Sequence, residues 1–196
     1  MAKTVIDRND VLMPDAYVKV RKQLKQELVA LKKNRRVEIG PVATCYFECY
    51  ETMLHQINEM LYIEKGGEEQ LQDELDAYAS LVPNGQELTA TVMFEIDDPI
   101  RRRNFLSKLG GVEETMFIRF GDEEVKGIPE NDIDRTTADG KASSVQFIHF
   151  PFTPQQIKGF MEAGQIIMGF SHAEYAHMVV LGKATQQALS SDFNLS

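Results

Sequence analysis

The chain has few of the residues and runs that mark several large classes of protein. Its 196 residues include two cysteines and no tryptophan, which argues against a small disulfide-rich secreted fold. No apolar run approaches the roughly 18 residues that a membrane-spanning helix needs. The first ten residues, MAKTVIDRND, have no apolar stretch of the kind found in secretory signals. We therefore expect a cytoplasmic protein without a membrane segment, long enough to bury a core.

The two cysteines and the absence of known catalytic motifs limit the kinds of reaction that the chain could catalyse. Cys45 and Cys49 are four residues apart on a predicted helix, a separation that seldom gives disulfide geometry. We expect buried, reduced and unreactive thiols. The sequence has no Gly-x-Ser-x-Gly, no cysteine with a motif-placed histidine and no phosphate-binding glycine loop. No familiar catalytic constellation is present, so whether the protein is an enzyme stays open.

Positive charge is concentrated at the start of the chain. Residues 1–36 hold ten Lys or Arg and four Asp or Glu, whereas the rest holds eleven and twenty-six. A basic leading helix could bind nucleic acid or phospholipid. However, Tyr17 is the only aromatic residue among these basic positions. The favoured interpretation is a basic helix that leans on the acidic remainder, within the chain or across a dimer, and nucleic-acid binding is the weaker alternative.

Apolar spacing predicts an α+β fold. Helices are predicted over residues 13–36, about 44–65 and 68–83, followed by strands over 87–97, 115–121, 123–128, 144–152, 165–172 and 174–181. Short helices are predicted after Asp98, after Thr153 and at the end of the chain. We expect one domain over residues 1–196, with a helical part at about 14–82 and a sheet-rich part at about 87–196, in which helices dock on one side of a mostly antiparallel sheet.

Three further features belong to the sheet-rich part. The order strand, Pro-initiated short helix, strand pair occurs twice, near 88–128 and 144–181, which suggests a duplicated arrangement. A strand pair around Gly121-Asp122 is predicted to form a hairpin. The polar stretch at 129–143 is long for a loop, and loops of that length are usually mobile or functional.

Several segments together resemble a known bacterial family. They are RRVEIGP at 35–41, FE at 47–48, the series from Thr52 to Glu64, LVPNGQELTATVMFEI at 81–96, SSVQFIHF at 143–150 and SHAEYAHMVVL at 171–181. Over nearly the whole chain they resemble DUF3501, a family without an established activity. The resemblance implies that the gene lies beside genes for rubrerythrin-like and iron–sulfur proteins. It therefore implies an accessory role in redox metabolism. It covers Glu48, Thr52, Gln56, Glu59 and His172, but not His55.

A row of polar residues is the first candidate site. Glu48, Thr52, His55 and Glu59 are spaced by four, three and four, so on a helix they share one side. Three interpretations are open: a solvated polar face, a contact site for a partner or small ligand, and a metal site in which His55, Glu59 and His172 are the weak candidates. The predicted helix that carries this row has no Glu-x-x-His, which excludes a ferritin-like di-iron site built on it.

Other residues extend the candidate site. His172 lies at a predicted strand end and is the best single candidate for acid–base work, although a structural turn histidine is the more frequent case; Tyr175 follows it. His149 is predicted to be half-buried and hydrogen-bonded. Arg36 is predicted to pair with Glu48 or Glu59. The complete candidate polar or ligand site is Arg36, Glu48, Thr52, Gln56, Glu59, His172 and Tyr175.

These observations lead to two rival functional hypotheses. The first is an accessory or binding protein linked to rubrerythrin-like or iron–sulfur partners, acting as a homo-oligomer, since two-fold pairs are the commonest assemblies. The alternative is a metal- or ligand-dependent enzyme that unites Glu48, Glu59 and His172 in one pocket. The sequence identifies no cofactor. Whether these three side chains converge decides between the two.

Overall fold

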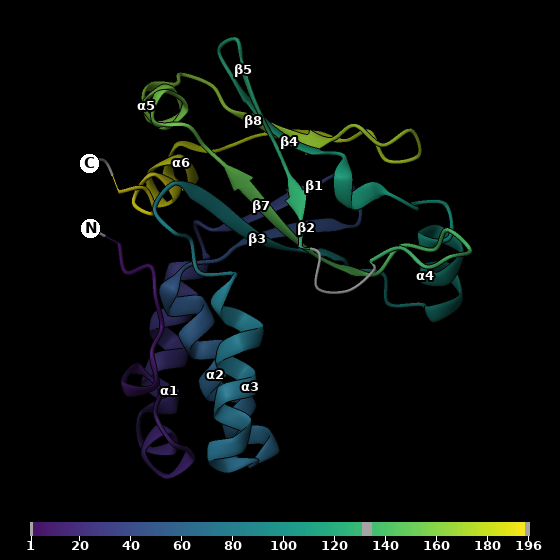
Figure 1. Cartoon of the computed structure of the whole chain (residues 1–196). Helices are drawn as coiled ribbons and strands as arrows, with labels where there is room; N and C mark the ends of the chain where they lie inside the picture. The colour runs from purple at the N-terminus through teal and green to yellow at the C-terminus, as the bar shows by residue number, and fades with distance from the viewer. Residues whose placement is uncertain (1, 131–134, 195–196) are drawn as a thin grey trace.

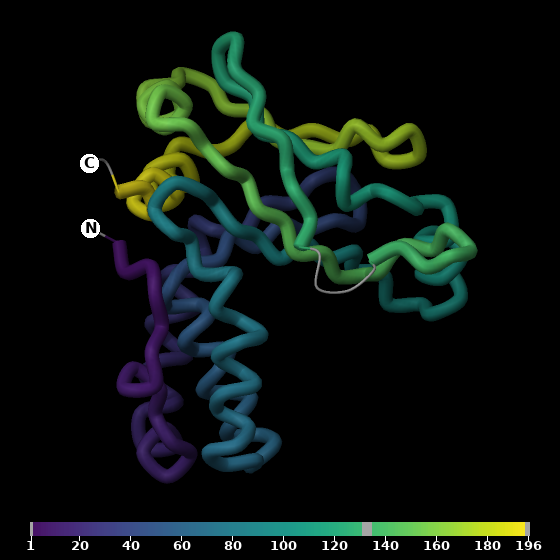
Figure 2. Tube along the Cα trace, viewed as in Figure 1, coloured from purple at the N-terminus to yellow at the C-terminus, as the bar shows by residue number. Residues whose placement is uncertain are grey.

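Three helices form an arm that projects from a body made of two β-sheets (Figure 1). The computed structural model describes residues 2–130 and 135–194. The trace shows the arm meeting the body only at one end, beside the first sheet (Figure 2). The predicted α+β class, with mostly antiparallel strands, is confirmed.

The arm consists of α1 (Pro14–Lys32), α2 (Tyr50–Glu64) and α3 (Gly67–Ala79), preceded by a 3-10 turn at Arg8–Asp10. Its second helix lies in the middle and contacts both of the others. One side of α2 packs on α3 through Met53, Ile57 and Leu61, which join a separate apolar core. The other side faces α1. The arm is therefore built around α2.

The first sheet has the strand order β1-β2-β3-β7-β6, with every neighbouring pair antiparallel. Its strands are β1 (Arg36–Ile39), β2 (Ala43–Phe47), β3 (Glu87–Phe94), β6 (Ile128–Pro129) and β7 (Val145–Pro151). The second sheet has the order β5-β4-β8-β9 and is also antiparallel. Its strands are β4 (Met116–Phe120), β5 (Glu123–Lys126), β8 (Ile167–Phe170) and β9 (Met178–Val180).

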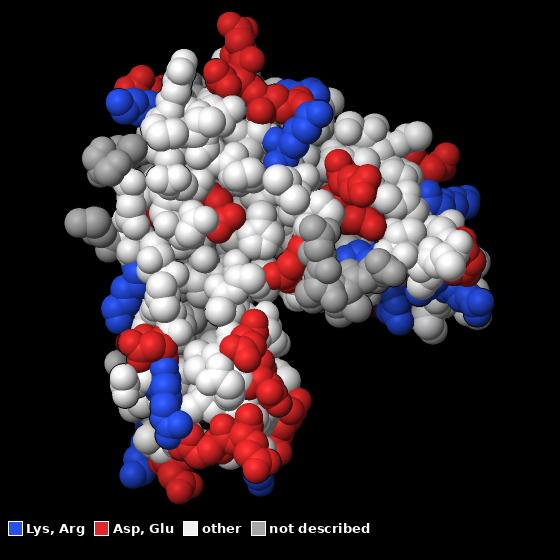
Figure 3. Space-filling model, in the orientation of Figure 1, with Lys and Arg blue, Asp and Glu red and all other residues white. Residues whose placement is uncertain are grey.

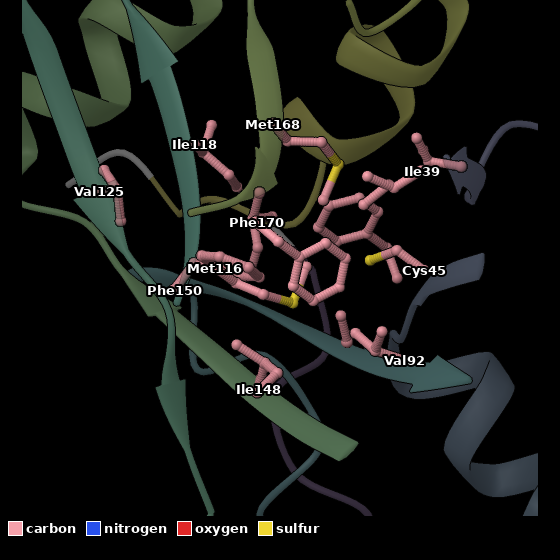
Figure 4. Close-up of a cluster of buried hydrophobic side chains, with 14 of the residues drawn as sticks. Ile39, Cys45, Val92, Met116, Ile118, Val125, Ile148, Phe150, Met168 and Phe170 are labelled. Atoms are coloured by element: carbon pink, nitrogen blue, oxygen red, sulfur yellow. The ribbon is translucent and has the colours of Figure 1, made fainter. Parts of the chain in front are cut away.

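The two sheets face each other across the main core. Figure 4 shows Val92, Ile148 and Phe150 of the first sheet pointing toward Met116 and Met168 of the second. Short helices close the ends of the body: α4 (Pro99–Leu106), a 3-10 turn at Val112–Glu114, α5 (Pro154–Glu162) and α6 (Lys183–Ser190). Among the described residues, no helix is long and apolar enough to cross a membrane.

The repeated element order predicted from the sequence corresponds to a structural repeat. The series β3-α4-β4-β5 is followed by β7-α5-β8-β9. In the first sheet β3 and β7 are neighbours, and in the second sheet β4 and β8 are neighbours, with β5 and β9 outside them. Each half therefore contributes one strand to the first sheet and a hairpin to the second. The predicted hairpin across Gly121-Asp122 is β4-β5.

One predicted helix is wrong at its start. We expected a helix from about Thr44 to Lys65, but Ala43–Phe47 is strand β2 and α2 begins only at Tyr50. The strand lies between β1 and β3, and four of its five residues are buried. A strand covered on both faces has no polar–apolar alternation, so its sequence did not distinguish it from a helix. Cys45 and Cys49 are therefore not on one helix.

The interpretation of the polar row as a solvated face of α2 is also wrong. Glu48 and Thr52 are buried, with 6% and 2% of their surface exposed, and His55 and Glu59 are half-buried. That expectation assumed a helix covered on one side. Because α2 is the middle helix, its polar side is covered as well. The predicted polar stretch at 129–143 includes residues 131–134, which lie outside the described part of the chain.

Candidate functional site

A pocket of about 350 Å³ lies where the arm joins the first sheet. We call it the junction pocket. Its arm side is formed by α1, α2, α3 and the segment that follows α3, and its sheet side by β2, β3 and β7. Figure 3 shows this side of the molecule, with the corner between arm and body open to solvent. The residues lining the pocket are Lys32, Tyr46, Glu48, Met53, Gln56, Tyr78, Leu81, Thr91, Met93, Val145 and Phe147.

Strand register explains the sheet side of this pocket. Tyr46 is paired with Thr91 across β2 and β3, and Thr91 with Phe147 across β3 and β7. Directly paired residues project from the same face of a sheet. The opposite face carries Cys45, Val92 and other core residues. The row Tyr46, Thr91, Phe147 therefore faces the arm.

Glu48 occupies the short connection between β2 and α2. Its backbone N–H donates to Thr89 O at 2.9 Å, which continues the pairing of β2 with β3 for one residue. Its carboxylate accepts two short hydrogen bonds, from Thr52 Oγ1 to Oε2 and from Thr91 Oγ1 to Oε1, both 2.6 Å. Among the described residues, Glu48 forms no ion pair within 4.0 Å. It is a buried carboxylate held by neutral hydroxyl groups.

The remaining walls combine polar and apolar groups. Gln56 Nε2 donates a long hydrogen bond of 3.5 Å to the Tyr78 hydroxyl, so both side chains have hydrogen-bonding capacity to spare. Met53 and Leu81 are buried beside them. The exposed Lys32 is at the rim. The pocket thus has a negative charge at its wall, neutral hydrogen-bonding groups, an apolar lining and a cation at its mouth.

Glu59 belongs to a different cluster, between α1 and α2. It accepts a bidentate pair from Arg21, with both distances 2.8 Å, and a hydrogen bond from Tyr17 Oη at 2.6 Å. Lys25 Nζ is 3.3 Å away. The Arg21 hydrogen bonds lower the pKa of Glu59 to about 2. Burial, with the Glu59 hydrogen bond, raises the pKa of Tyr17. This carboxylate is fully engaged in attaching α1 to α2.

His55 lines a separate groove of about 300 Å³ between α1 and α2, whose other residues are mostly leucines. Its Nδ1 lies 3.2 Å from the Tyr17 hydroxyl. Burial lowers the pKa of His55, which favours the neutral ring. Among the described residues, no group of three or more His, Cys, Asp or Glu side chains could hold a metal ion.

The candidate residues near the end of the chain, His172 and Tyr175, lie in the body. They are away from Glu48 and Glu59. His172 Nε2 is 3.2 Å from Gly110 O, and its Nδ1 accepts from Glu174 N at 3.2 Å. Tyr175 is buried, and its hydroxyl donates to Ile39 O at 2.7 Å. The structure therefore does not bring Glu48, Glu59 and His172 into one pocket, and the predicted constellation of the enzyme hypothesis is not formed.

Tyr175 has a clear structural position. Its hydroxyl also accepts from the backbone N–H groups of Val42 and Ala43 at 3.3 and 3.0 Å. It thereby fixes the turn between β1 and β2, where Gly40 has a φ of 70°. A Cβ at Gly40 would lie 2.9 Å from the Tyr175 hydroxyl, so glycine is needed there for space as well as for conformation.

The predicted pairing of Arg36 with Glu48 or Glu59 is wrong. Arg36 lies on the exposed edge strand β1, where its guanidinium is 2.8 Å from Glu38 and its Nε donates to Tyr46 Oη at 3.4 Å. The neighbouring Arg35 points the other way and forms a buried ion pair with Asp192 at 2.6 Å. Alternation along the strand separates the two arginines. The sequence predicts a helix over residues 13–36, and a helix does not place neighbouring side chains on opposite faces. The opposite orientations of Arg35 and Arg36 were therefore not predicted.

The cysteines and His149 agree with their predictions. Cys45 and Cys49 are both buried free thiols. Burial raises the pKa of both thiols, that of Cys49 to about 11, which keeps them protonated and poorly nucleophilic. His149 is half-buried and lies 3.1 Å from Glu87. That hydrogen bond raises the pKa of His149.

Comparisons with known proteins agree with this architecture. The family model described as "Protein of unknown function (DUF3501)" matches residues 5–193. The chain belongs to the DUF3501 family. A similar solved structure is the "novel protein of unknown function" from Burkholderia pseudomallei K96243, with 34% identity and a TM-score of 0.89. The similarity covers 97% of this chain and 100% of that one. A search of curated proteins found no match.

In this DUF3501 protein, three of the candidate residues meet at the junction pocket: Glu48, Thr52 and Gln56. Sequence reasoning missed the residues that complete it, namely Thr91, Tyr78 and Phe147. They lie far from Glu48 in the sequence. Strand pairing brings Thr91 and Phe147 close, and the packing of α3 on α2 brings Tyr78. One signal was available. Thr91 is a hydroxyl residue that alternates with apolar ones in a strand otherwise suited to burial.

Proposed function

We propose that this DUF3501 protein is a binding protein that takes a small organic cation into the junction pocket. The observation that carries the proposal is Glu48, a carboxylate with 6% exposure at the wall of a cavity. Its two hydroxyl partners satisfy hydrogen bonds but bring no positive charge. A buried charge without a counter-ion is costly. A protonated amine in the pocket would supply the missing charge.

The shape and lining of the pocket support a ligand of modest size. A volume of about 350 Å³ is at the small end of the range for ligand pockets. Met53, Met93 and Phe147 offer soft apolar surface, which suits an aliphatic or aromatic body behind the amine. Gln56 and Tyr78 can hydrogen-bond a neutral polar group. Lys32 at the rim can pair with an acidic group on the same ligand.

Isothermal titration calorimetry with phenethylamine, compared with the acid of similar size, phenylpropionate, tests the proposal. The amine is expected to bind and the acid not. Glu48→Gln keeps the shape of the side chain and its acceptor oxygen but removes the charge, and we expect it to weaken amine binding by about 10- to 100-fold. Glu64→Gln, an exposed position on α2, is the matched control and should leave binding unchanged.

Two results would contradict the proposal. One is amine binding that Glu48→Gln leaves intact, because the carboxylate would then have no role in recognition. The other is a failure of phenethylamine, n-butylamine and a guanidinium such as agmatine to bind at millimolar concentration. Circular dichroism of Glu48→Gln separates lost binding from lost fold.

We propose, in addition, that the binding protein acts beside redox proteins. The support is the family resemblance, which implies rubrerythrin-like or iron–sulfur partners. The cysteines of this chain are buried, so on this view the redox chemistry belongs to the partner and the present chain contributes recognition. Affinity capture with the full chain from cells that encode such proteins should recover one of them. If neither the wild-type chain nor Glu48→Gln captures a rubrerythrin-like or an iron–sulfur protein, this part of the proposal is contradicted.

A further inference from the structure

The outer side of α1 is a basic surface with little internal compensation. Residues 19–33 contain six Lys or Arg and a single acidic residue, Glu27. Arg21 and Lys25 are paired with Glu59. Lys19, Lys22, Lys32 and Lys33, in contrast, are exposed and form no ion pair within 4.0 Å among the described residues. The helix thus carries unneutralised positive charge along its length.

This side of α1 also lines a groove. Two hollows of about 540 and 970 Å³ share Gln26 and Val29, so they are continuous along the helix. From Val18 to Arg36 the groove follows α1 and the residues after it, with Tyr62 of α2 on one side and the edge strands β1 and β9 near its far end. At 1.5 Å per helical residue it is roughly 25 Å long. We call it the α1 groove.

The groove combines charge with exposed apolar surface. Val18 and Val29 are 50% and 73% exposed. Valine is usually buried, so this much exposure is high for a helix that packs on α2. The one acidic residue among those that line it is Glu38, which Arg36 already holds at 2.8 Å. An occupant should therefore present acidic side chains and some apolar surface to the groove, in an element about as long as a helix.

The same chain contains an element with the complementary charge. Residues 66–100 contain nine Asp or Glu and no Lys, Arg or His, and five of these acids lie on α3. Glu69, Asp73 and Asp76 are exposed, are spaced by four and three, and so share one side of the helix. They form no ion pair within 4.0 Å among the described residues. Figure 3 shows Asp and Glu gathered over this part of the arm.

The complementary surfaces cannot satisfy each other within one chain, because α2 lies between α1 and α3. Among the described residues, the ion pairs of the arm join α1 to α2 and the first 3-10 turn to α3, but not α1 to α3. Two copies can satisfy them. In a two-fold pair the same contact occurs twice, so the α3 of each copy meets the α1 groove of the other.

We infer that two copies of this chain associate through their arms, with the acidic side of each α3 in the α1 groove of the other copy. The thirteen residues of α3 span about 20 Å, which fits within the groove. Pairing α1 with α1 would place lysine against lysine, and like charges at an interface are strongly unfavourable. The arrangement does not involve Glu48 or a ligand of the junction pocket, although Lys32 and Tyr46 border both the pocket and the α1 groove.

Sedimentation velocity of the full chain tests the inference. Wild type is expected to dimerise at micromolar concentration in 50 mM salt and to dissociate as salt is raised to 0.5 M, because exposed charges are screened. The double variant Lys22→Glu, Lys33→Glu should raise the dimer Kd on the order of 100-fold. The variant Glu69→Lys, Asp73→Lys should do the same. The matched control Lys126→Glu, Lys158→Glu changes two exposed body lysines and should leave the dimer intact.

Mixing the two reversed variants is the decisive experiment. Each alone should be monomeric, whereas their mixture should form a heterodimer, because one of the two contacts then has both charges exchanged and attracts again. A misfolded variant could not be rescued in this way. A wild type that is monomeric at 100 µM in low salt overturns the inference. So does a dimer that neither reversal affects, and so does a monomer that binds heparin through Lys22 and Lys33, since the groove would then serve a polyanion.

Discussion

The arm and the body of this protein are held together in different ways. In the body, aromatic rings pack directly on one another: Phe152, Phe160 and Phe193 have ring centroids 4.9 to 5.8 Å apart. In the arm, α1 has nineteen residues, and only Tyr17 is buried. Its attachment depends on the hydrogen bonds and ion pairs around Glu59. The body is therefore stabilised by its own core, whereas α1 leaves much of its surface available to other molecules.

This contrast has energetic consequences. Burial of an aromatic side chain is worth several kcal/mol, while a partly exposed ion pair is worth about 1 kcal/mol or less. Damage to the body should thus unfold the whole chain, and damage to α1 should be local. Four predictions test this difference, from the largest expected effect to the smallest.

The largest effect is expected from truncation of the body core. Phe160 is fully buried against Phe120, Phe152 and Phe193, so Phe160→Ala should lower the free energy of unfolding by about 4 kcal/mol. Leu28, half-buried on α1, is the matched position, and Leu28→Ala should cost less than about 1 kcal/mol. Urea unfolding followed by circular dichroism measures both. Equal losses would mean that the arm is as well packed as the body.

The next effect concerns the buried ion pair that links Arg35, just before β1, to Asp192 in the segment after α6. Arg35 and Asp192 are 4% and 5% exposed, and their charged groups are 2.6 to 2.8 Å apart. Arg35→Met should cost about 3 kcal/mol, because it leaves the Asp192 carboxylate buried without its cation. The double variant Arg35→Met, Asp192→Leu should recover a large part of that loss. A double variant less stable than Arg35→Met would show that the pair acts otherwise than through charge.

The Glu59 cluster predicts a pH dependence of the arm. The Arg21 hydrogen bonds lower the pKa of Glu59 from 4.5 to about 2. A lowered pKa means that the charged form is favoured by folding, so its contribution is complete above pH 4.5 and is lost as the pH falls toward 2. The protection of the α1 amides against hydrogen exchange, corrected for the intrinsic rate at each pH, should fall more between pH 5 and pH 3 than that of the β3 amides. Glu59→Gln should remove this difference in pH response.

The smallest effect comes from His149, and its pH dependence is opposite to that of Glu59. The Glu87 hydrogen bond raises the pKa of His149 above 6.5, so the protonated ring is favoured by folding. Its contribution is complete below pH 6.5 and is lost as the pH rises through the raised value. The free energy of unfolding should fall by less than about 1 kcal/mol between pH 6 and pH 8, and His149→Gln should flatten this slope. An NMR titration of the His149 ring that gives a pKa below 6.5 would contradict the stabilising role of the Glu87 hydrogen bond.

The sequence predicted most of the fold because most elements carry their own local signal. Pro14, Pro99 and Pro154 each begin a helix as expected, and Gly121 forms the hairpin turn. Strand β2 was missed because it is covered on both faces and lacks alternation. The two sheets were predicted as one. A periodicity analysis identifies strands but does not say which of them pair.

The site was less predictable than the fold. Glu48, Thr52 and Gln56 lie on one short stretch and were identified together, but Glu59 was placed with them and points to α1 instead. That error followed from treating α2 as a helix with one covered side. Thr91 and Phe147, 43 and 99 residues beyond Glu48, reach the pocket only through the pairing of β3 with β2 and β7. Long-range pairing of this kind has no signature in a single sequence.

The junction pocket has a consequence for how the two regions move. Its walls come from the arm on one side and from the sheet on the other, so no single region contains a complete binding surface. Any molecule held there bridges the two and opposes their separation. Occupancy should therefore slow the partial opening in which the helices detach while the sheets stay intact, and would turn a weakly attached appendage into a rigid one.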